Sequence, residues 1–149
     1  MDRKKVFFFV LFSMILVIGL ISCRKKEAAD TSFTRMIGRW KLTAIGTDDN
    51  GDGVIENSEV SNEPAANSDI LYFGSDSIGT ETTIFSGVSS PVLNFKWSLL
   101  APDSLWVAYS AHDTVNYYIY LLNSSNLVLA TNITLDSGTI LVQKYYNKY

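Results

Sequence analysis

Gly38-Arg39-Trp40-Lys41-Leu42-Thr43-Ala44 is the stretch that decides the fold. Its apolar residues alternate with polar ones, and a period of two is typical of a strand with one buried face. The same alternation recurs in seven more short segments, most clearly from Leu93 to Leu99. No segment with a helical period is long enough to connect parallel strands. The sequence therefore predicts an all-β fold.

The expected strands are separated by turns rich in Gly, Ser, Asn and Asp. Consecutive strands with such short links form an antiparallel meander. A meander that closes on itself has no exposed edges, and closure is a common solution for such chains. We therefore expect an eight-stranded, up-and-down antiparallel barrel. Its strands are expected at residues 40–44, 69–74, 78–86, 93–99, 105–109, 115–122, 127–130 and 139–146.

The start of the first strand carries a family resemblance. Gly38-Arg39-Trp40 resembles the G-x-W motif of the lipocalins, and a short helical turn is expected before it, over residues 33–37. The later pattern is similar to small lipocalin-like lipoproteins of Gram-negative bacteria, and the likeness covers residues 33–148. It implies that Trp40 packs beneath a basic side chain of the last strand, for which Lys144 is the counterpart. The second lipocalin motif, a TDxxxN-like turn, is not evident.

The inward face of such a barrel is either a pocket for one small apolar ligand or a filled core. Strands this short leave a shallow cup, which favours the core. Five tyrosines either rim the mouth of the barrel or an interface, or form ordinary cross-strand pairs. They are Tyr109, Tyr118, Tyr120, Tyr145 and Tyr146. The candidate ligand-binding residues share an inward position and are Trp40, Phe73, Phe85, Phe95, Trp97, Val107, Tyr117 and Ile119.

The acidic segment Asp48–Glu59 matches the calcium-loop pattern D-x-[DN]-x-[DN]-G-x5-E at every position, with Gly53 where a sharp turn is required. The alternative is a solvated acidic loop. Residues 43–47 read as strand rather than as an entering helix, and Pro64 leaves room for only about one turn of a leaving helix. The expected Ca²⁺ ligands are Asp48, Asn50, Asp52, the Val54 carbonyl, Glu56 and Glu59.

The first residues have the parts of a secretory signal peptide, with a basic start, the apolar run Val6–Ile21 and a small residue before the only cysteine. Leu20-Ile21-Ser22-Cys23 resembles the lipobox of bacterial lipoproteins. That resemblance implies cleavage after residue 22 and a diacylglyceryl group on Cys23. The alternative is an uncleaved membrane helix, but the apolar run is shorter than the roughly 20 residues that span a bilayer.

The expected organisation is therefore a signal peptide at residues 1–22, a lipidated Cys23 with a flexible tether at residues 23–32, and a barrel domain at residues 33–149. The lipid would attach the protein to the bilayer of the bacterial cell envelope. The resemblance to Gram-negative lipoproteins implies the outer membrane, with its periplasmic and its surface face both open.

Charge and composition exclude several functions. Without residues 1–22 the chain carries 9 basic and 14 acidic side chains, so nucleic acid is not an expected partner. His112 is the only histidine, and no serine has a nucleophile-elbow setting, so no catalytic residues and no enzyme are expected. Two functions remain. One is the binding of a small apolar ligand, and the other is a non-catalytic interaction module that inhibits or joins an envelope protein.

Overall fold

The computed structural model describes residues 27–149, except residues 65, 102, 111 and 137, with side chains from Ser32 onward. The predicted signal peptide and Cys23 lie outside these residues. Within the described part, no helix is both long enough and apolar enough to cross a membrane. The chain divides into two units, Met1–Thr31 and Ser32–Tyr149, and every strand described below belongs to the second.

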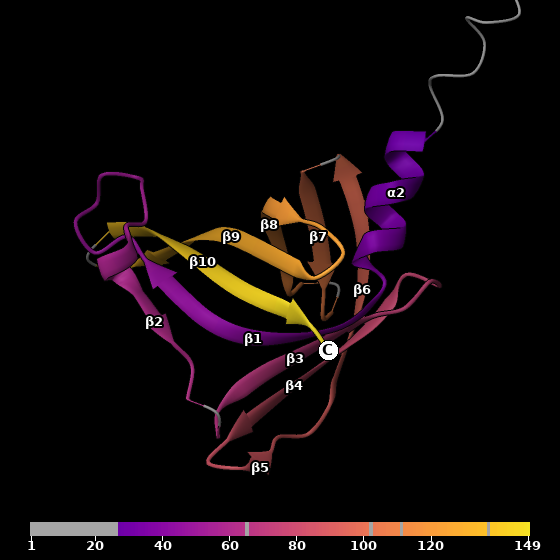
Figure 1. Cartoon of the computed structure of the whole chain (residues 1–149), viewed down its shortest axis with the longest axis horizontal. Coiled ribbons are helices and arrows are strands. Elements are labelled where there is room, and N and C mark those ends of the chain that lie inside the picture. The colour runs from indigo at the N-terminus through magenta and orange to yellow at the C-terminus, as the bar shows by residue number, and fades with distance from the viewer. Residues whose placement is uncertain (1–26, 65, 102, 111, 137) are drawn as a thin grey trace, which may run out of the picture. The chain divides into compact units, whose positions relative to one another are not determined.

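The described strands form one antiparallel sheet that closes on itself (Figure 1). Eight of them make the ring in the order β1, β3, β4, β6, β7, β8, β9, β10, and β10 pairs with β1 again. The predicted eight-stranded meander is therefore confirmed. Two short strands lie outside the ring, β2 beside β1 and β5 beside β4. The strands are β1 (Gly38–Thr47), β2 (Val60–Asn62), β3 (Ser68–Phe73), β4 (Ile78–Phe85), β5 (Val88–Ser89), β6 (Leu93–Ala101), β7 (Ser104–Ala108), β8 (Thr114–Leu122), β9 (Asn126–Leu135) and β10 (Gly138–Lys148).

Several elements are longer than the sequence predicted, and two of them extend the furthest. Helix α2 (Glu27–Met36) replaces the single expected turn and takes up part of the expected tether. Its Ala28-Ala29 pair favours helix, and Arg35 in the last turn complements the helix dipole. Strand β9 continues to Leu135 because it pairs with β10 along its whole length, up to the pair Leu135 and Gly138.

The side chains of strand β1 change from one face of the sheet to the other at a bulge between Leu42 and Ala44. One extra residue shifts the period of two, so residues after a bulge change face. Leu42 lies in the core before the bulge and Ile45 packs against the core after it. Gly46 then faces outward, and a side chain there would collide with Ile55. The absence of a side chain at Gly46 thus lets the acidic loop pack on the outside of the barrel.

Trp40 lies fully buried at the start of β1. Its indole Nε1 donates a hydrogen bond to the Met36 carbonyl oxygen at 2.7 Å. The Nζ of Lys148 lies 4.9 Å from the centre of the Trp40 ring, within the range of a cation–π interaction. The basic partner is therefore Lys148 and not Lys144, because Lys148 is paired directly with Trp40 in the register of β1 and β10.

Candidate functional site

The interior of the barrel is packed around the predicted ligand-binding residues. The ring of Phe73 meets Phe95 and Trp97 edge-on, with centroids 5.5 and 5.2 Å apart. Six of the eight predicted side chains expose 7% of their surface or less, so they contact one another rather than a space that would admit water. Tyr117 is half-buried and packs against the same cluster. The six are Trp40, Phe73, Phe95, Trp97, Val107 and Ile119.

Phe85 is not part of this interior, contrary to the sequence-based expectation. Its side chain is 69% exposed, and that of Leu93, at the start of β6, is 55% exposed. The alternation along β4 correctly places Phe85 on the inner face of the sheet. However, β6 pairs with β4 only over Ile78–Glu81, and beyond that point β4 pairs with the short β5. Phe85 therefore lies past the part of the wall that encloses the core.

Polar side chains face one another in the part of the barrel away from Trp40. The Lys144 Nζ lies 3.5 Å from the Asp69 carboxylate. The hydroxyl of Tyr109 donates a hydrogen bond to the Glu81 carboxylate. Neither Asp69 nor Glu81 was predicted as a site residue, although each breaks the apolar alternation of an expected strand. That break is the signal that would have identified them.

Burial and these carboxylates keep the neighbouring phenols protonated. Burial raises the pKa of Tyr117 to about 12, and the Glu81 and Asp69 charges add to the effect. Burial, followed by the hydrogen bond to Glu81, also raises the pKa of Tyr109. Burial raises the pKa of Tyr146 well above its ordinary value. All three phenols therefore stay protonated to a higher pH than an exposed tyrosine, and they lie inside the barrel rather than at an outer rim.

The predicted calcium loop is held together by its own backbone. Both carboxylate oxygens of Asp48 accept hydrogen bonds from backbone N–H groups, those of Gly51 and Asp52 on one oxygen and that of Gly53 on the other. The Glu59 carboxylate accepts three more, one of them from the Glu56 N–H at 3.1 Å. Within the described residues, no three His, Cys, Asp or Glu side chains lie close enough together to hold a metal ion.

The two glutamates at the end of this loop shift each other's pKa in opposite directions. A hydrogen bond between their carboxyl groups raises the pKa of Glu56 and lowers the pKa of Glu59. The oxygen donors of the loop suit Ca²⁺ in kind, but their arrangement would have to change for them to converge on one ion. The calcium site therefore stays a prediction.

If the loop binds calcium, Ca²⁺ is expected to stabilise the fold. At ten times the dissociation constant, the gain in unfolding free energy would be about 1.4 kcal/mol, measured as a rise in the thermal midpoint that a chelator reverses. Mg²⁺ at equal ionic strength and the variant Glu59→Gln, at the position where the pattern requires Glu, are the controls. An unchanged midpoint at millimolar Ca²⁺, or an equal rise with Mg²⁺, would rule out the site.

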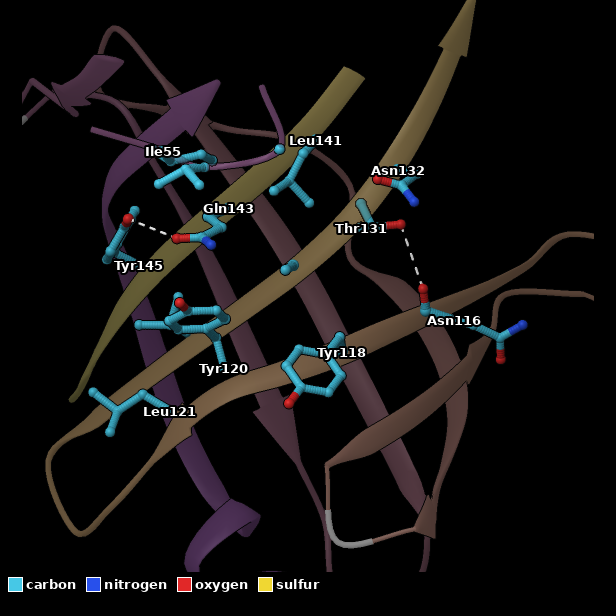
Figure 2. A pocket seen from close by; sticks show the side chains of 14 residues that line it. Ile55, Asn116, Tyr118, Tyr120, Leu121, Thr131, Asn132, Leu141, Gln143 and Tyr145 are labelled. Atoms are coloured by element: carbon cyan, nitrogen blue, oxygen red, sulfur yellow. Dashed lines mark hydrogen bonds between the residues drawn. The ribbon is translucent and has the colours of Figure 1, made fainter. Parts of the chain in front are cut away.

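A groove of about 710 Å³ lies on the outer face of β8, β9 and β10 (Figure 2). Its floor is apolar and consists of Val128 and Ala130 on β9 and Leu141 on β10. The segment Gly53–Ile55 of the acidic loop forms one wall. This wall exists because the bulge in β1 and the bare Gly46 let Ile55 pack against the outside of the barrel.

Aromatic and amide side chains complete the groove. Three of the five tyrosines that were expected at a mouth or interface line it, namely Tyr118, Tyr120 and Tyr145. Three amides lie among them, on Asn116, Asn132 and Gln143, and none of the lining residues is charged. The groove was not predicted from the sequence. Its tyrosines could be found by alternation, whereas the packing of a distant loop against them could not.

One hydrogen bond orients the most buried polar group of the groove. Burial, followed by the neighbouring Tyr120, raises the pKa of Tyr145, and its hydroxyl donates to Oε1 of Gln143 at 2.8 Å. Gln143 is only 7% exposed. Its Nε2 lies on the side away from Tyr145 (Figure 2) and has no hydrogen-bond partner in the described part of the chain.

No family model and no curated protein matches this chain. Among solved structures, a lipocalin-like protein from Bacteroides uniformis is similar, with a TM-score of 0.51 and 11% identity over 77% of this chain and 99% of that one. A bovine odorant-binding protein in complex with undecanal matches with a TM-score of 0.46 and 15% identity, covering 78% of this chain and 72% of that one. Lobster apocrustacyanin A1 matches with a TM-score of 0.47 and 11% identity, covering 78% and 62%. Together with the closed ring of eight strands, the Bacteroides match shows that this chain has the fold of the lipocalin-like barrels.

Proposed function

We propose that this protein is a non-catalytic binding protein that holds a small ligand in the groove on the outside of its barrel. The observation that carries the proposal is the groove itself. Its volume of about 710 Å³ is within the range of small-molecule sites, and it combines an apolar floor with a few polar groups, as such sites do. It is also present without any rearrangement of the fold, so binding needs no reorganisation of the backbone.

The predicted interior site for a small apolar ligand is less favourable. Phe73 and Trp97 at its centre expose 0% and 1% of their surface, so a ligand would have to separate side chains that already pack together. Separating a packed core loses dispersion contacts along every surface that opens. The groove needs no such separation. Binding in the interior therefore remains a prediction, and the groove is the better candidate.

Attachment to a membrane is part of the proposal and depends on the sequence alone. The lipobox-like segment ending at Cys23 supports export, cleavage and lipidation, which would place the barrel at the bacterial cell envelope. Acyl chains hold a protein at a bilayer through buried CH₂ groups, and two chains make the attachment stable. A tethered binding protein of this kind would concentrate its ligand at the membrane surface.

A second candidate function, a protein interaction module, is favoured by one observation. Four apolar side chains between β4 and β6 are more than half exposed: Phe85, Val88, Val92 and Leu93. Phe85 and Val88 are directly paired across the β4–β5 turn, so at least these two form one patch. Exposed apolar patches are typical of protein contacts.

Native mass spectrometry of the chain from residue 24, exported and purified from its own host, distinguishes the two functions. We expect the wild type to retain an extra mass of small-molecule size, and Tyr118→Ser in the groove to lose it, because Tyr118 lines the groove. Phe85→Ser, outside the groove, is the control and is expected to keep the mass. An added mass of protein size that Phe85→Ser removes would favour the interaction module instead.

A further inference from the structure

We infer that the ligand of the outer groove is a neutral carbohydrate, an inference that rests on the binding function proposed above. Charge gives the first reason. No lining residue is charged, so an anionic ligand meets no cation in the groove and faces the acidic loop at its wall. A cationic ligand would find no carboxylate among the lining residues, and those of Asp48 and Glu59 point back into their own loop. The lining therefore selects an uncharged molecule.

The hydrogen-bonding groups of the groove exclude a purely apolar ligand. Gln143 is more than nine-tenths buried and its Nε2 lacks a partner in the described part of the chain, so an apolar ligand would cut this donor off from water. The side-chain amides of Asn116 and Asn132 make no hydrogen bonds within the described residues either. Each amide offers both a donor and an acceptor, as does each hydroxyl of a sugar.

The aromatic groups of the groove suit the flat face of a sugar ring, which presents C–H groups. Tyr118 and Tyr120 are 52% and 67% exposed, and their rings meet edge-on with centroids 6.3 Å apart. An aromatic face is electron-rich, so it attracts the C–H groups that a pyranose presents on its flat face, while the sugar hydroxyls point sideways toward the amides. The groove thus has apolar surface and neutral hydrogen-bonding groups arranged around one space.

A peptide is the main competing occupant, and the sheet argues against it. Peptides commonly bind a β protein by adding a strand to a free edge. The strand at the floor of this groove, β9, has no free edge there, because Leu127–Ala130 pair with β8 on one side and with β10 on the other. A peptide would therefore have to bind here through its side chains alone, without the backbone ladder.

Isothermal titration of the mature protein with a panel of neutral oligosaccharides tests the inference. The panel consists of gluco-, xylo-, manno-, galacto- and chito-oligosaccharides. We expect at least one to bind, and Gln143→Leu to weaken its binding by about tenfold, the cost of one lost hydrogen bond. Tyr118→Ala is expected to weaken it by about fivefold to tenfold. Tyr72→Ala, a 41% exposed tyrosine that does not line the groove, is the matched control and is expected to bind like the wild type.

Three further ligands distinguish a failure of the carbohydrate inference from a failure of the proposed binding function. Oligogalacturonate, a neutral tripeptide and undecanal serve as the acidic, peptide and apolar probes. If one of them binds in a Tyr118-dependent way and no neutral sugar does, the groove is a binding site and the carbohydrate inference is wrong. If no probe binds and no small mass is retained from the host, both proposals fail. Asn132→Ala, at an exposed position, replaces Gln143→Leu if that variant does not fold.

Discussion

Replacing Trp40 by alanine is expected to lower the free energy of unfolding by about 3–5 kcal/mol, the usual cost of removing a large buried aromatic side chain. The indole is fully buried, so the change leaves a cavity that the closed ring of strands cannot easily fill. It also leaves the Met36 carbonyl without its side-chain donor and removes the ring beneath Lys148. Urea unfolding followed by circular dichroism measures the loss.

Trp106 provides the matched control for this prediction. It has the same side chain but is only partly buried, and it lies on the outer face between the inward residues Leu105 and Val107. Trp106→Ala is expected to cost less than about 2 kcal/mol, because less apolar surface returns to water. If the two variants lost the same free energy of unfolding, Trp40 would contribute no more to the stability of the barrel than a partly buried tryptophan does.

Replacing Cys23 by serine is expected to abolish lipidation completely. Cys23 is the only cysteine in the chain, and a thiolate is a far better nucleophile than a serine hydroxyl, so no other sulfur can form the thioether. Growth with a clickable palmitate analogue, followed by mass spectrometry of the intact protein, measures both the label and the new amino terminus. The wild type should carry lipid and lack residues 1–22, whereas the variant should carry no label and retain them.

Ser22→Ala is the control for the lipidation experiment. It keeps a small residue before the cysteine, so cleavage and labelling are expected to continue as in the wild type. Label on the Cys23→Ser protein, or a wild-type chain that retains residues 1–22, would show that the lipobox-like segment is not used. The barrel and its groove would then belong to a protein without this anchor.

The strand pattern was predictable because the information is local. Leu93 to Leu99 alternate between two faces whatever they pack against, and the turn residues on either side limit how far each strand runs. The eight strands and their closure are therefore confirmed. The basic partner of Trp40 was misassigned for the opposite reason. Choosing Lys148 over Lys144 requires the register of β1 against β10, which joins the two ends of the barrel.

The candidate site shows the same limit. The sequence singled out Tyr118, Tyr120 and Tyr145, but it indicated only a mouth or an interface for them. Gln143 was not predictable, because a lone glutamine in a strand has no signature of its own. Its role becomes visible only in the structure, where the Tyr145 hydroxyl orients it and the Gly53–Ile55 segment lines the same groove.

By itself the sequence determined the all-β class, the number of strands in the ring and the tyrosines that alternate along the last strands. The tertiary structure alone decided that the interior is packed around Phe73 and Trp97, that Phe85 lies outside it, and that the Gly53–Ile55 segment turns an open sheet face into a groove. The reason is one of range. Alternation is set by neighbouring residues. A bulge, in contrast, reverses the faces of the residues that follow it, and the loop packs against strands roughly 60 to 90 residues away. Both depend on long-range strand pairing, which the local pattern does not specify.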